Sequence, residues 1–537
     1  MTKRLLLLLS TLIVAVLVMA ACGGGAADPV TPEATPAPPA AEAQETPAPE
    51  APPAEPVGRT HLNVVTSNLA VSMDPVRSND SASAQVNVQI YDRLFGMDYD
   101  TFEILPQLAI NWNMPDAQTV EVELRQGVYF HNGQPMTALD VQWSLERAGA
   151  SPHMAAVTSP IDSVTIVDDF NVLVHLEVPF APILRHLAHS GTAIVPHGME
   201  EEELAEHPIG TGPWMFDSLV IGDRLELVRN DNWWNQAALP LLETMTIRLI
   251  SDSPGRLLAV ETGEADLAIG LLATEAAPAE AFDNVVVHRR PNLSTVYVGF
   301  NTVTYPFDNP LIRRAVNHAV NTQAIVDVVL HGVGAPAQGP IADIVFGFYP
   351  IGGLDFDLDM ARALMAEAGY PDGLPESVDI WWNVPNMIRS DISEIVQHSL
   401  REIGIDVNVH GLEWGTILED LESPDSGWDM FVMGWVSLTG DADYGLFPLF
   451  HSSMFGGAGN RTFYYNPEVD RLLELGRSEL DESRRLAYYR EVLEIIRDDS
   501  PWIFINQGEE LHASSTDLRG FIVNPGGHQN FSRIWFD

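Results

Sequence analysis

Short strand-like segments alternate with longer segments of helical spacing from residue 60 onwards, and this alternation constrains the fold more than any other feature. Residues 61–66 and 120–124 alternate apolar and polar side chains as a strand does, whereas 313–330, 391–403 and 484–497 repeat apolar residues at helical spacing. Further short β-rich segments lie at 171–176, 296–300, 378–382 and 430–432. Strands flanked by helices predict an α/β fold. The absence of a 20–50-residue repeat excludes a solenoid or propeller.

The chain is strongly acidic. Its 537 residues carry a formal charge of −46, and Lys3 is the only lysine. Such a surface repels phosphate backbones and anionic bilayers, so we expect no nucleic-acid partner. Without further lysines the body has neither a Schiff-base amine nor the lysine of a phosphate-binding loop, which excludes PLP enzymes and P-loop ATPases. The length allows two or three domains.

The N-terminal residues have the layout of an export signal. Lys3 and Arg4 precede an apolar run over residues 5–21, which is shorter than a membrane-spanning helix, and Cys22 follows directly. This arrangement resembles the lipobox of bacterial lipoproteins, in which the cysteine is acylated and becomes the first mature residue. We therefore expect a signal peptide over 1–21 and lipidation of Cys22. The alternative is a plain signal or anchor with an incidental cysteine.

Residues 23–58 are rich in Ala, Pro, Glu and Gly and contain almost no large apolar side chain. Such a segment buries too little surface to offset the entropy of ordering, so we expect a disordered linker over 22–59 that tethers the body to the membrane. A leftover segment without a spacing role fits this composition equally well. No second apolar run is long enough to cross a bilayer, so we expect a soluble body.

The common catalytic motifs are missing from the sequence. It contains no His-Glu-x-x-His helix, no Gly-x-Ser-x-Gly elbow and no Gly-rich dinucleotide loop after a strand. His186 and His189 lie at roughly helical spacing, but without a nearby cysteine or matching carboxylate an ordinary pair is the simpler interpretation than a metal site. Asp441 and Asp443 share one short loop and lack the spacing of a calcium loop. We expect no catalysis, no metal and no cofactor.

Tryptophan and tyrosine residues are frequent in the body. Their rings combine broad contact area with a polar group, which suits a ligand cleft, although packing in the core or between lobes is the simpler explanation for any single ring. The residues are Trp233, Trp234, Trp381, Trp382, Trp414, Trp428, Trp435, Tyr444, Tyr464 and Tyr465.

Several motifs follow one another in a fixed order across the body. The sharpest is 124–133 (Leu-Arg-Gln-Gly-Val-Tyr-Phe-His-Asn-Gly), continued by 137–141 (Thr-Ala-Leu-Asp-Val). Others lie at 73–75 (Met-Asp-Pro), 90–94 (Ile-Tyr-Asp-Arg-Leu), 105–109 (Leu-Pro-Gln-Leu-Ala), 208–214 (Pro-Ile-Gly-Thr-Gly-Pro-Trp), 229–234, 263–266, 300–301, 313–316, 368–371 and 465–470. This ordered set resembles the extracellular solute-binding proteins of family 5, the peptide/nickel group that delivers cargo to ABC importers.

The resemblance implies an α/β, two-lobed periplasmic-binding-protein type II fold with an extra subdomain in lobe one. It also implies that the ligand is enclosed between the lobes and that two crossovers form the hinge. On this basis we expect crossovers near 290–291 and 504–507. The expected segments are lobe one at 60–103, 205–290 and 505–537, the inserted subdomain at 104–204, and lobe two at 291–504.

The resemblance also leads to candidate ligand contacts. In the peptide-binding members, an aspartate three residues after a loop tryptophan pairs with the free amino group of the ligand. Here the residue three positions after Trp435 is Leu438, and the usual Asp-Pro-Asp run is replaced by 441–443 (Asp-Ala-Asp). Either Asp441 takes the amine from a shifted position or the cargo has no free amine there.

We expect Trp435 and Tyr444 to contact the cargo from the cleft face of lobe two, where packing of Trp435 at the hinge is the alternative. Arg461 follows a Gly-rich stretch, and its planar guanidinium can hold a carboxylate through two parallel hydrogen bonds. A surface ion pair is the alternative for Arg461. The candidate ligand-binding residues are Trp435, Asp441, Tyr444, Asn460 and Arg461.

The resemblance implies a membrane-tethered receptor that captures a small solute by lobe closure and delivers it to the permease subunits of an ABC transporter. We expect an oligopeptide or peptide-like cargo. An oligosaccharide, a metal chelate, an opine-like compound and another non-peptide solute remain alternatives, as do a sensory receptor with this fold and a secreted hydrolase. We expect a monomer that is exported and either lipid-anchored to the outer face of the cytoplasmic membrane or periplasmic.

Overall fold

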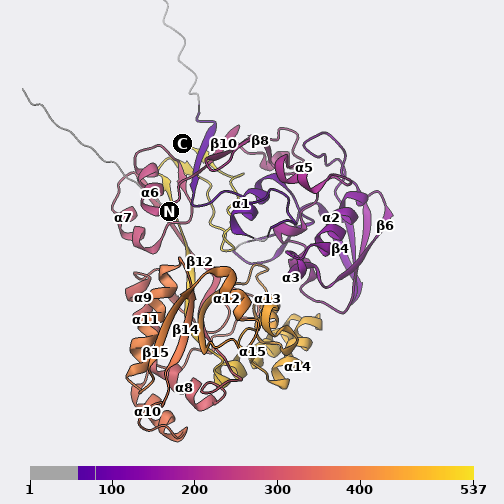
Figure 1. Cartoon of the computed structure of the whole chain (residues 1–537). Helices are drawn as coiled ribbons and strands as arrows, with labels where there is room; N and C mark the ends of the chain where they lie inside the picture. Colours follow the sequence, from indigo (N-terminus) through magenta and orange to yellow (C-terminus); the bar gives the residue numbers. More distant parts are fainter. Residues whose placement is uncertain (1–57, 79, 99) are drawn as a thin grey trace, which may run out of the picture. The chain divides into compact units, whose positions relative to one another are not determined.

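The computed structural model describes residues 58–78, 80–98 and 100–537. The expected signal peptide, Cys22 and most of the expected linker lie outside the described residues. The described residues form two α/β lobes, which confirms the predicted fold class (Figure 1).

One mixed eleven-stranded sheet runs through both lobes. Its strands lie in the order β15 (Val407–Leu412), β14 (Val378–Asn383), β16 (Met430–Val436), β12 (Val285–Phe300), β17 (Trp502–Ser515), β11 (Leu267–Ala268), β1 (His61–Thr66), β10 (Thr244–Leu249), β9 (Arg224–Arg229) and β8 (Trp214–Val220), and β13 (Ala335–Pro336) also pairs with β17. Lobe two contains β14–β16 and lobe one contains β1 and β8–β11. The strands β12 and β17 pass through both lobes.

The two long strands β12 and β17 connect the lobes. They pair antiparallel along most of their length, but the register shifts between Pro291 and Thr295, where the partners are Glu509 and Gln507. A β-bulge of this kind bends a strand and interrupts its ladder of hydrogen bonds. The expected crossovers at 290–291 and 504–507 fall inside these continuous strands.

Lobe two has three layers, a central sheet between two layers of helices. Successive side chains of each strand point to opposite faces of the sheet, so they pack alternately against the two helical layers. Val298, Val432 and Ile503 pack against the first helical layer, whereas Tyr297, Phe431 and Trp502 face the second. The first layer consists of α8 (Pro310–Ala319), α9 (Thr322–Val329), α10 (Leu358–Glu367) and α11 (Met387–Arg401). The second contains α12 (Trp414–Asp420), α13 (Ala442–Phe450), α14 (Pro467–Ser478) and α15 (Glu482–Asp499).

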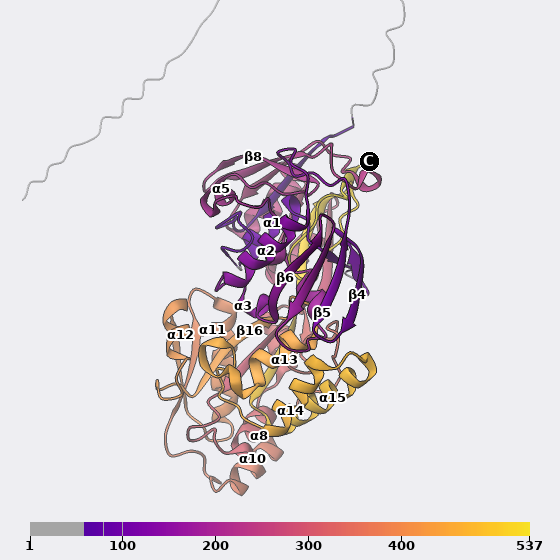
Figure 2. The same cartoon turned by 90° about the vertical axis from the view of Figure 1, so that its right-hand side faces the viewer.

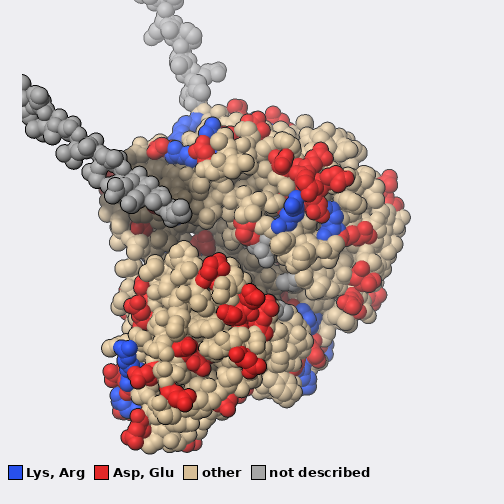
Figure 3. Space-filling model, viewed as in Figure 1, with Lys and Arg blue, Asp and Glu red and all other residues tan. Residues whose placement is uncertain are grey.

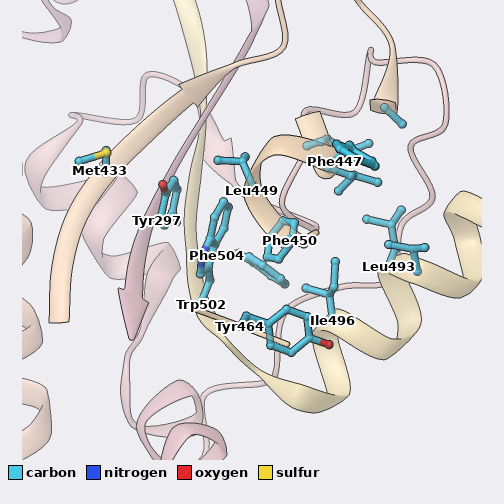
Figure 4. Close-up of a cluster of buried hydrophobic side chains, with 14 of the residues drawn as sticks. Tyr297, Met433, Phe447, Leu449, Phe450, Tyr464, Leu493, Ile496, Trp502 and Phe504 are labelled. Carbon is cyan, nitrogen blue, oxygen red and sulfur yellow. The ribbon is translucent and has the colours of Figure 1, made fainter. Parts of the chain in front are cut away.

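The second layer buries many aromatic rings. Tyr297 and Trp502 stack with their ring centroids 3.4 Å apart, and Phe450 of α13 packs on Trp502 at 4.5 Å (Figure 4). This core fixes β16 and α13, and it therefore also fixes the loop between them, which faces lobe one.

The helical spacing over 313–330 predicts one helix, but the structure has two. Asn321 interrupts the segment, because its side chain accepts a hydrogen bond from the backbone N–H of Ala324 and caps α9. The other predicted segments are confirmed: 391–403 overlaps α11, 484–497 lies in α15, and 61–66 is β1.

Lobe one carries an additional four-stranded antiparallel sheet. Its order is β4 (Ala109–Asp116), β5 (Thr119–Leu124), β7 (Asn171–Leu176) and β6 (Ile161–Asp168), and α2 (Ala138–Ala150) packs against it with its own core. We call this sheet and the helices α2, α3 (Ala155–Thr158) and α4 (Ile183–His186) the inserted subdomain. It lies beside α13–α15 of lobe two, and its helix α4 contacts the start of α13 (Figures 1 and 2).

The remaining helices of lobe one are α1 (Ser81–Ile90), α5 (Glu201–Glu206), α6 (Ser253–Glu261) and α7 (Ala276–Glu280). Two small two-stranded sheets pair β2 (Phe95–Met97) with β3 (Ile104–Pro106) and β18 (Leu518–Arg519) with β19 (Trp535–Phe536). Within the described ranges, no helix has the length and apolar character needed to span a bilayer.

Candidate ligand-binding site between the lobes

A cavity of about 40 Å³ lies where the loop after β16 meets lobe one. Lobe one contributes most of its walls, and β12 and the loop after β16 close it from the other side. Its lining includes Arg93, Phe102, His189 and His528 of lobe one, with Leu293 of β12 and Leu438 of lobe two. Figure 3 shows a hollow between the lobes, with carboxylates spread over the surface of both.

The lobes approach each other closely beside this cavity. Gly440 has a φ of +64°, and a Cβ at that position would lie 2.7 Å from Cδ1 of Phe102 and 3.5 Å from the sulfur of Met97. Glycine is therefore required there both by the backbone conformation and by the contact with lobe one.

Three of the sequence motifs converge on one buried carboxylate, Asp92. Its oxygens accept hydrogen bonds from Thr211 (3.0 Å), Trp233 (3.3 Å), Trp234 (2.7 Å) and Gln107 (3.0 Å). Burial raises the pKa of Asp92, and these neutral donors oppose the rise. The motif tryptophans at 233–234 therefore anchor the first segment of lobe one and do not line the 40 Å³ cavity.

Arg93 follows Asp92 directly but does not pair with it. The Arg93 guanidinium makes no hydrogen bond or ion pair with another described residue, and its Nε is buried. It lines the 40 Å³ cavity and also a neighbouring cavity of about 260 Å³ in lobe one. The two cavities share Val88, Arg93 and Met97 as walls.

Two histidines of lobe one border the same cavity. His189 accepts a hydrogen bond at Nδ1 from the backbone N–H of Gly191 at 3.0 Å, and burial together with the positive charge of nearby groups lowers its pKa to about 3. Burial and the charge of Arg93 lower the pKa of His528 to about 4. Both rings are neutral at pH 7.

Buried glutamines of α1 hold the loop that carries His528. Gln85 and Gln89 each donate a side-chain hydrogen bond of 2.6 Å to the carbonyl of Gln529, and Gln85 accepts one from its backbone N–H. Gln529 in turn accepts a hydrogen bond from the backbone N–H of Asn524. Residues more than 400 positions apart in the chain are thereby fixed around one cavity.

The structure brings Trp435 and Tyr444 together on the lobe-two side. The indole Nε1 of Trp435 donates to the carbonyl of Tyr444 at 3.0 Å, and the two ring centroids are 5.6 Å apart. Tyr444 also lies edge-on to His186 of the inserted subdomain at 6.2 Å. Burial raises the pKa of Tyr444 to about 12.

Asp441 is fully buried and holds two positive charges. It caps α13, its two oxygens accept from Arg485 at 2.8 and 3.1 Å, and Arg185 of the inserted subdomain lies 3.7 Å away. Burial opposes the charge of Arg485, but the attraction of Asp441 prevails and raises the pKa of the guanidinium. In this conformation Asp441 is therefore occupied by arginines of the protein itself.

Asn460 and Arg461 lie in another loop of lobe two. Asn460 is buried and donates to the carbonyls of His451 and Tyr464, while its oxygen accepts from Thr462 and the backbone N–H of Tyr464. Asn460 thus fixes the shape of its loop.

Arg461 donates to the carbonyls of Leu418 and Gly457, and burial lowers its pKa. Like Arg389 of α11, it lies near Tyr297 and forms no ion pair with a described residue, although the charge of Glu422 acts on it from farther away.

Sequence reasoning missed Arg93 and His528 as candidate site residues, and it considered His189 only as half of a metal pair. Arg93 lies in the motif at 90–94. Basic residues are few in so acidic a chain, and this could have identified Arg93 as a candidate from the sequence. The two histidines reach the cavity only through tertiary contacts, so the sequence carried no signal for them. His186 and His189 stay neighbours, since the backbone N–H of His189 donates to the carbonyl of His186, but the His186 ring bonds the carbonyl of Val157. In the described part of the chain, no group of three His, Cys, Asp or Glu side chains could hold a metal ion.

Comparison with known proteins gives a consistent picture. The model of the bacterial extracellular solute-binding proteins, family 5, matches residues 103–457. The chain is 30% identical over 473 residues to the glutathione-binding protein GsiB of Pectobacterium atrosepticum, covering 86% of this chain and 91% of that protein.

Solved structures of other proteins have the same fold as this chain. HbpA2 from Haemophilus parasuis superposes with a TM-score of 0.80 at 26% identity, covering 89% of this chain and all of that one. The periplasmic binding protein DppA from Helicobacter pylori, solved in complex with the peptide STSA, gives a TM-score of 0.75 at 27% identity, covering 89% and 98%.

Proposed function

Because the chain belongs to the bacterial extracellular solute-binding proteins of family 5, we propose that it captures a peptide-like solute between its lobes and delivers it to an ABC transporter permease. The observation that carries the proposal is the cavity between the lobes, whose walls come from both of them. A ligand that touches both lobes stabilises the closed state, and closure is then a population shift that the permease can recognise.

The peptide-like class is supported by the named ligands of the similar proteins, glutathione for GsiB and the peptide STSA for DppA. Leu438 favours a second class of cargo for the same receptor. A buried ammonium needs a buried carboxylate, and an apolar side chain stands where the family's amine-binding aspartate would be. The second candidate cargo is a solute without a free amine at that end.

Five residues of lobe two are proposed to form or support the cargo face. Trp435 and Tyr444 supply the aromatic contact, and Arg461 supplies a cation for an anionic end of the cargo. Asp441 and Asn460 hold the two loops that carry these groups, as their internal hydrogen bonds suggest.

We propose that the receptor performs no turnover. Isothermal titration with glutathione and a panel of di- and tripeptides, followed by mass spectrometry of the recovered solutes, tests this. We expect at least one solute to bind saturably and to be recovered intact. Release of cleaved solute would contradict the receptor role, and absence of binding by the whole panel would contradict a peptide-like cargo.

Anchoring through Cys22, export by the N-terminal signal and action as a monomer complete the proposal. The acidic body makes the lipid the expected means of membrane attachment, since the protein surface itself repels anionic bilayers.

A further inference from the structure

We propose that the cavity beside Leu438 is a subsite for an anionic group of the cargo, a carboxylate in the first instance, held by Arg93 together with His189 and His528. This inference rests on the proposed function, because it concerns the same cleft. It predicts that the negatively charged end of the cargo lies beside Leu438. In the peptide-binding members, an aspartate at this position pairs with the positively charged amino group of the ligand.

Arg93 is the fixed cation of the subsite. The chain has 74 acidic and 28 basic residues, so a carboxylate partner is easily found, as Arg147 finds Asp74 at 2.6 Å. Arg93 has no such partner among the described residues, although Asp92 precedes it. Four neutral donors hydrogen-bond the Asp92 carboxylate and hold it away from the Arg93 guanidinium. The guanidinium is therefore available to bind a ligand.

The histidines add neutral donors to this charge. Because Nδ1 of His189 accepts a hydrogen bond from Gly191, the proton of its neutral ring lies on Nε2, which has no partner among the described residues. The ring of His528 makes no hydrogen bond in the described part of the chain either. A carboxylate in the cavity would accept from such donors, and charge-assisted hydrogen bonds are the stronger kind.

The walls of the cavity favour an anion over an ammonium. Leu293, Leu438 and Phe102 are apolar, and no Asp or Glu is among the described lining residues. Asp80 and Glu510 act on His528 from outside the lining, and Asp92 acts on Arg93. An ammonium would meet the charge of Arg93 without a compensating carboxylate among the described lining residues, which is strongly unfavourable in a small buried site.

The size of the cavity is appropriate for one small group. Its 40 Å³ is a few times the roughly 10–15 Å³ that a cavity needs to hold one water molecule, so it admits a small group such as a carboxylate. The adjoining 260 Å³ cavity, which shares Val88, Arg93 and Met97 with it, gives the rest of a solute a place to continue.

The subsite can be tested without knowing the cargo. Wild-type protein is titrated at constant ionic strength with sodium acetate or with acetamide, its uncharged analogue, while the imidazole resonances of His189 and His528 are followed by NMR. These resonances are assigned with His189→Gln and His528→Gln. We expect a saturable shift with acetate and none with acetamide.

Matched variants connect the response to Arg93. Arg93→Gln should abolish the acetate response, and Arg93→Lys should keep part of it. Arg125→Gln should leave it unchanged, because Arg125 also forms no ion pair in the described ranges but stacks on Trp234 and donates to the carbonyl of Gln107. Equal shifts with acetate and acetamide, or loss of the response in Arg125→Gln, would overturn the subsite. Retained thermal stability confirms that each variant is folded.

Cargo binding gives the second measurement. For a tripeptide that binds the wild type, Arg93→Gln should weaken the free acid about 10- to 100-fold and should weaken its C-terminal amide far less. If no peptide binds while acetate still does, the proposed cargo class fails and the anion subsite stands. If a peptide binds with equal affinity as acid and amide and acetate does not bind, the subsite fails and the receptor function stands.

Discussion

Arg185 of the inserted subdomain and Asp441 of lobe two face each other across the boundary between the lobes, with 3.7 Å between Nε and Oδ2. Arg185 also lies over the ring of Phe346, 5.6 Å from its centroid, and Arg485 binds the same carboxylate from within lobe two. Because Arg185 and Asp441 belong to different lobes, opening separates them. The pair therefore favours the closed arrangement.

Removing the charge of Arg185 should weaken closure without unfolding the protein. We expect Arg185→Gln to reduce cargo affinity about 3- to 10-fold, the effect of a partly buried ion pair worth about 1 kcal/mol. Titration calorimetry measures the affinity, and small-angle scattering of the free protein should show a more open form. Arg77→Gln, which removes an ion pair within lobe one, is the control. Unchanged affinity and scattering in Arg185→Gln would refute the coupling.

Replacing Asp441 should affect stability far more. Asp441→Asn leaves the buried guanidinium of Arg485 without its carboxylate, and breaking a buried pair from one side costs about 3–5 kcal/mol. Urea unfolding measures the loss. The exposed pair of Arg229 and Asp231 provides the control, since Asp231→Asn should change stability by less than about 1 kcal/mol. A loss below about 1 kcal/mol in Asp441→Asn would mean that Arg485 finds another partner.

Trp435 is expected to contact the cargo through its ring. Trp435→Ala should lower cargo affinity at least about 10-fold, as aromatic anchors of binding sites commonly do. Trp435→Phe keeps a ring but loses the hydrogen bond to Tyr444, so it should lower stability by about 1 kcal/mol and retain most of the affinity. The partly exposed Trp535, in Trp535→Phe, controls for loss of an indole elsewhere. Unchanged affinity in Trp435→Ala would identify Trp435 as a packing residue.

The histidines of the cavity should make stability fall in acid. Their folded-state pKa values, about 3 for His189 and about 4 for His528, lie below the unfolded value near 6.5, so their contribution is complete above pH 6.5 and is lost as the pH falls toward those values. Because glutamine does not titrate, His528→Gln should gain about 2 kcal/mol of stability relative to the wild type between pH 7 and pH 4.5. Urea unfolding at both pH values gives this difference. A stability difference that does not change with pH would show that His528 titrates normally.

Cys22 is expected to carry the lipid that anchors the protein. Mass spectrometry of the mature protein should find acyl chains on this residue, and more than one chain is needed because a single chain binds a membrane only marginally. Cys22→Ala should move the protein from the membrane fraction to the soluble fraction. A variant that still sediments with membranes, or an unmodified cysteine in the wild type, would exclude this anchor.

The sequence by itself determined much of the local structure. Period-two alternation located β1, helical spacing located α11 and α15, and the ordered motifs implied two lobes with an inserted subdomain. The strands and helices depend on neighbours a few residues apart, which a single chain displays directly, whereas the two lobes and the inserted subdomain were implied by the resemblance to a known family. The division of 313–330 into α8 and α9 was missed, because the cap formed by Asn321 competes with an apolar period that continues across it.

Only the tertiary structure decided which charged groups are available to a ligand. Asp441, a candidate for binding an amine, is paired with Arg485, 44 residues away. Arg93, in contrast, has no partner among the described residues, because Thr211, Trp233 and Trp234 hold the neighbouring Asp92. A charged side chain looks the same in sequence whether or not the fold supplies its partner. Its pairing depends on distances between strands and loops that the chain brings together only on folding, and those distances place Arg93 beside Leu438 at the cavity.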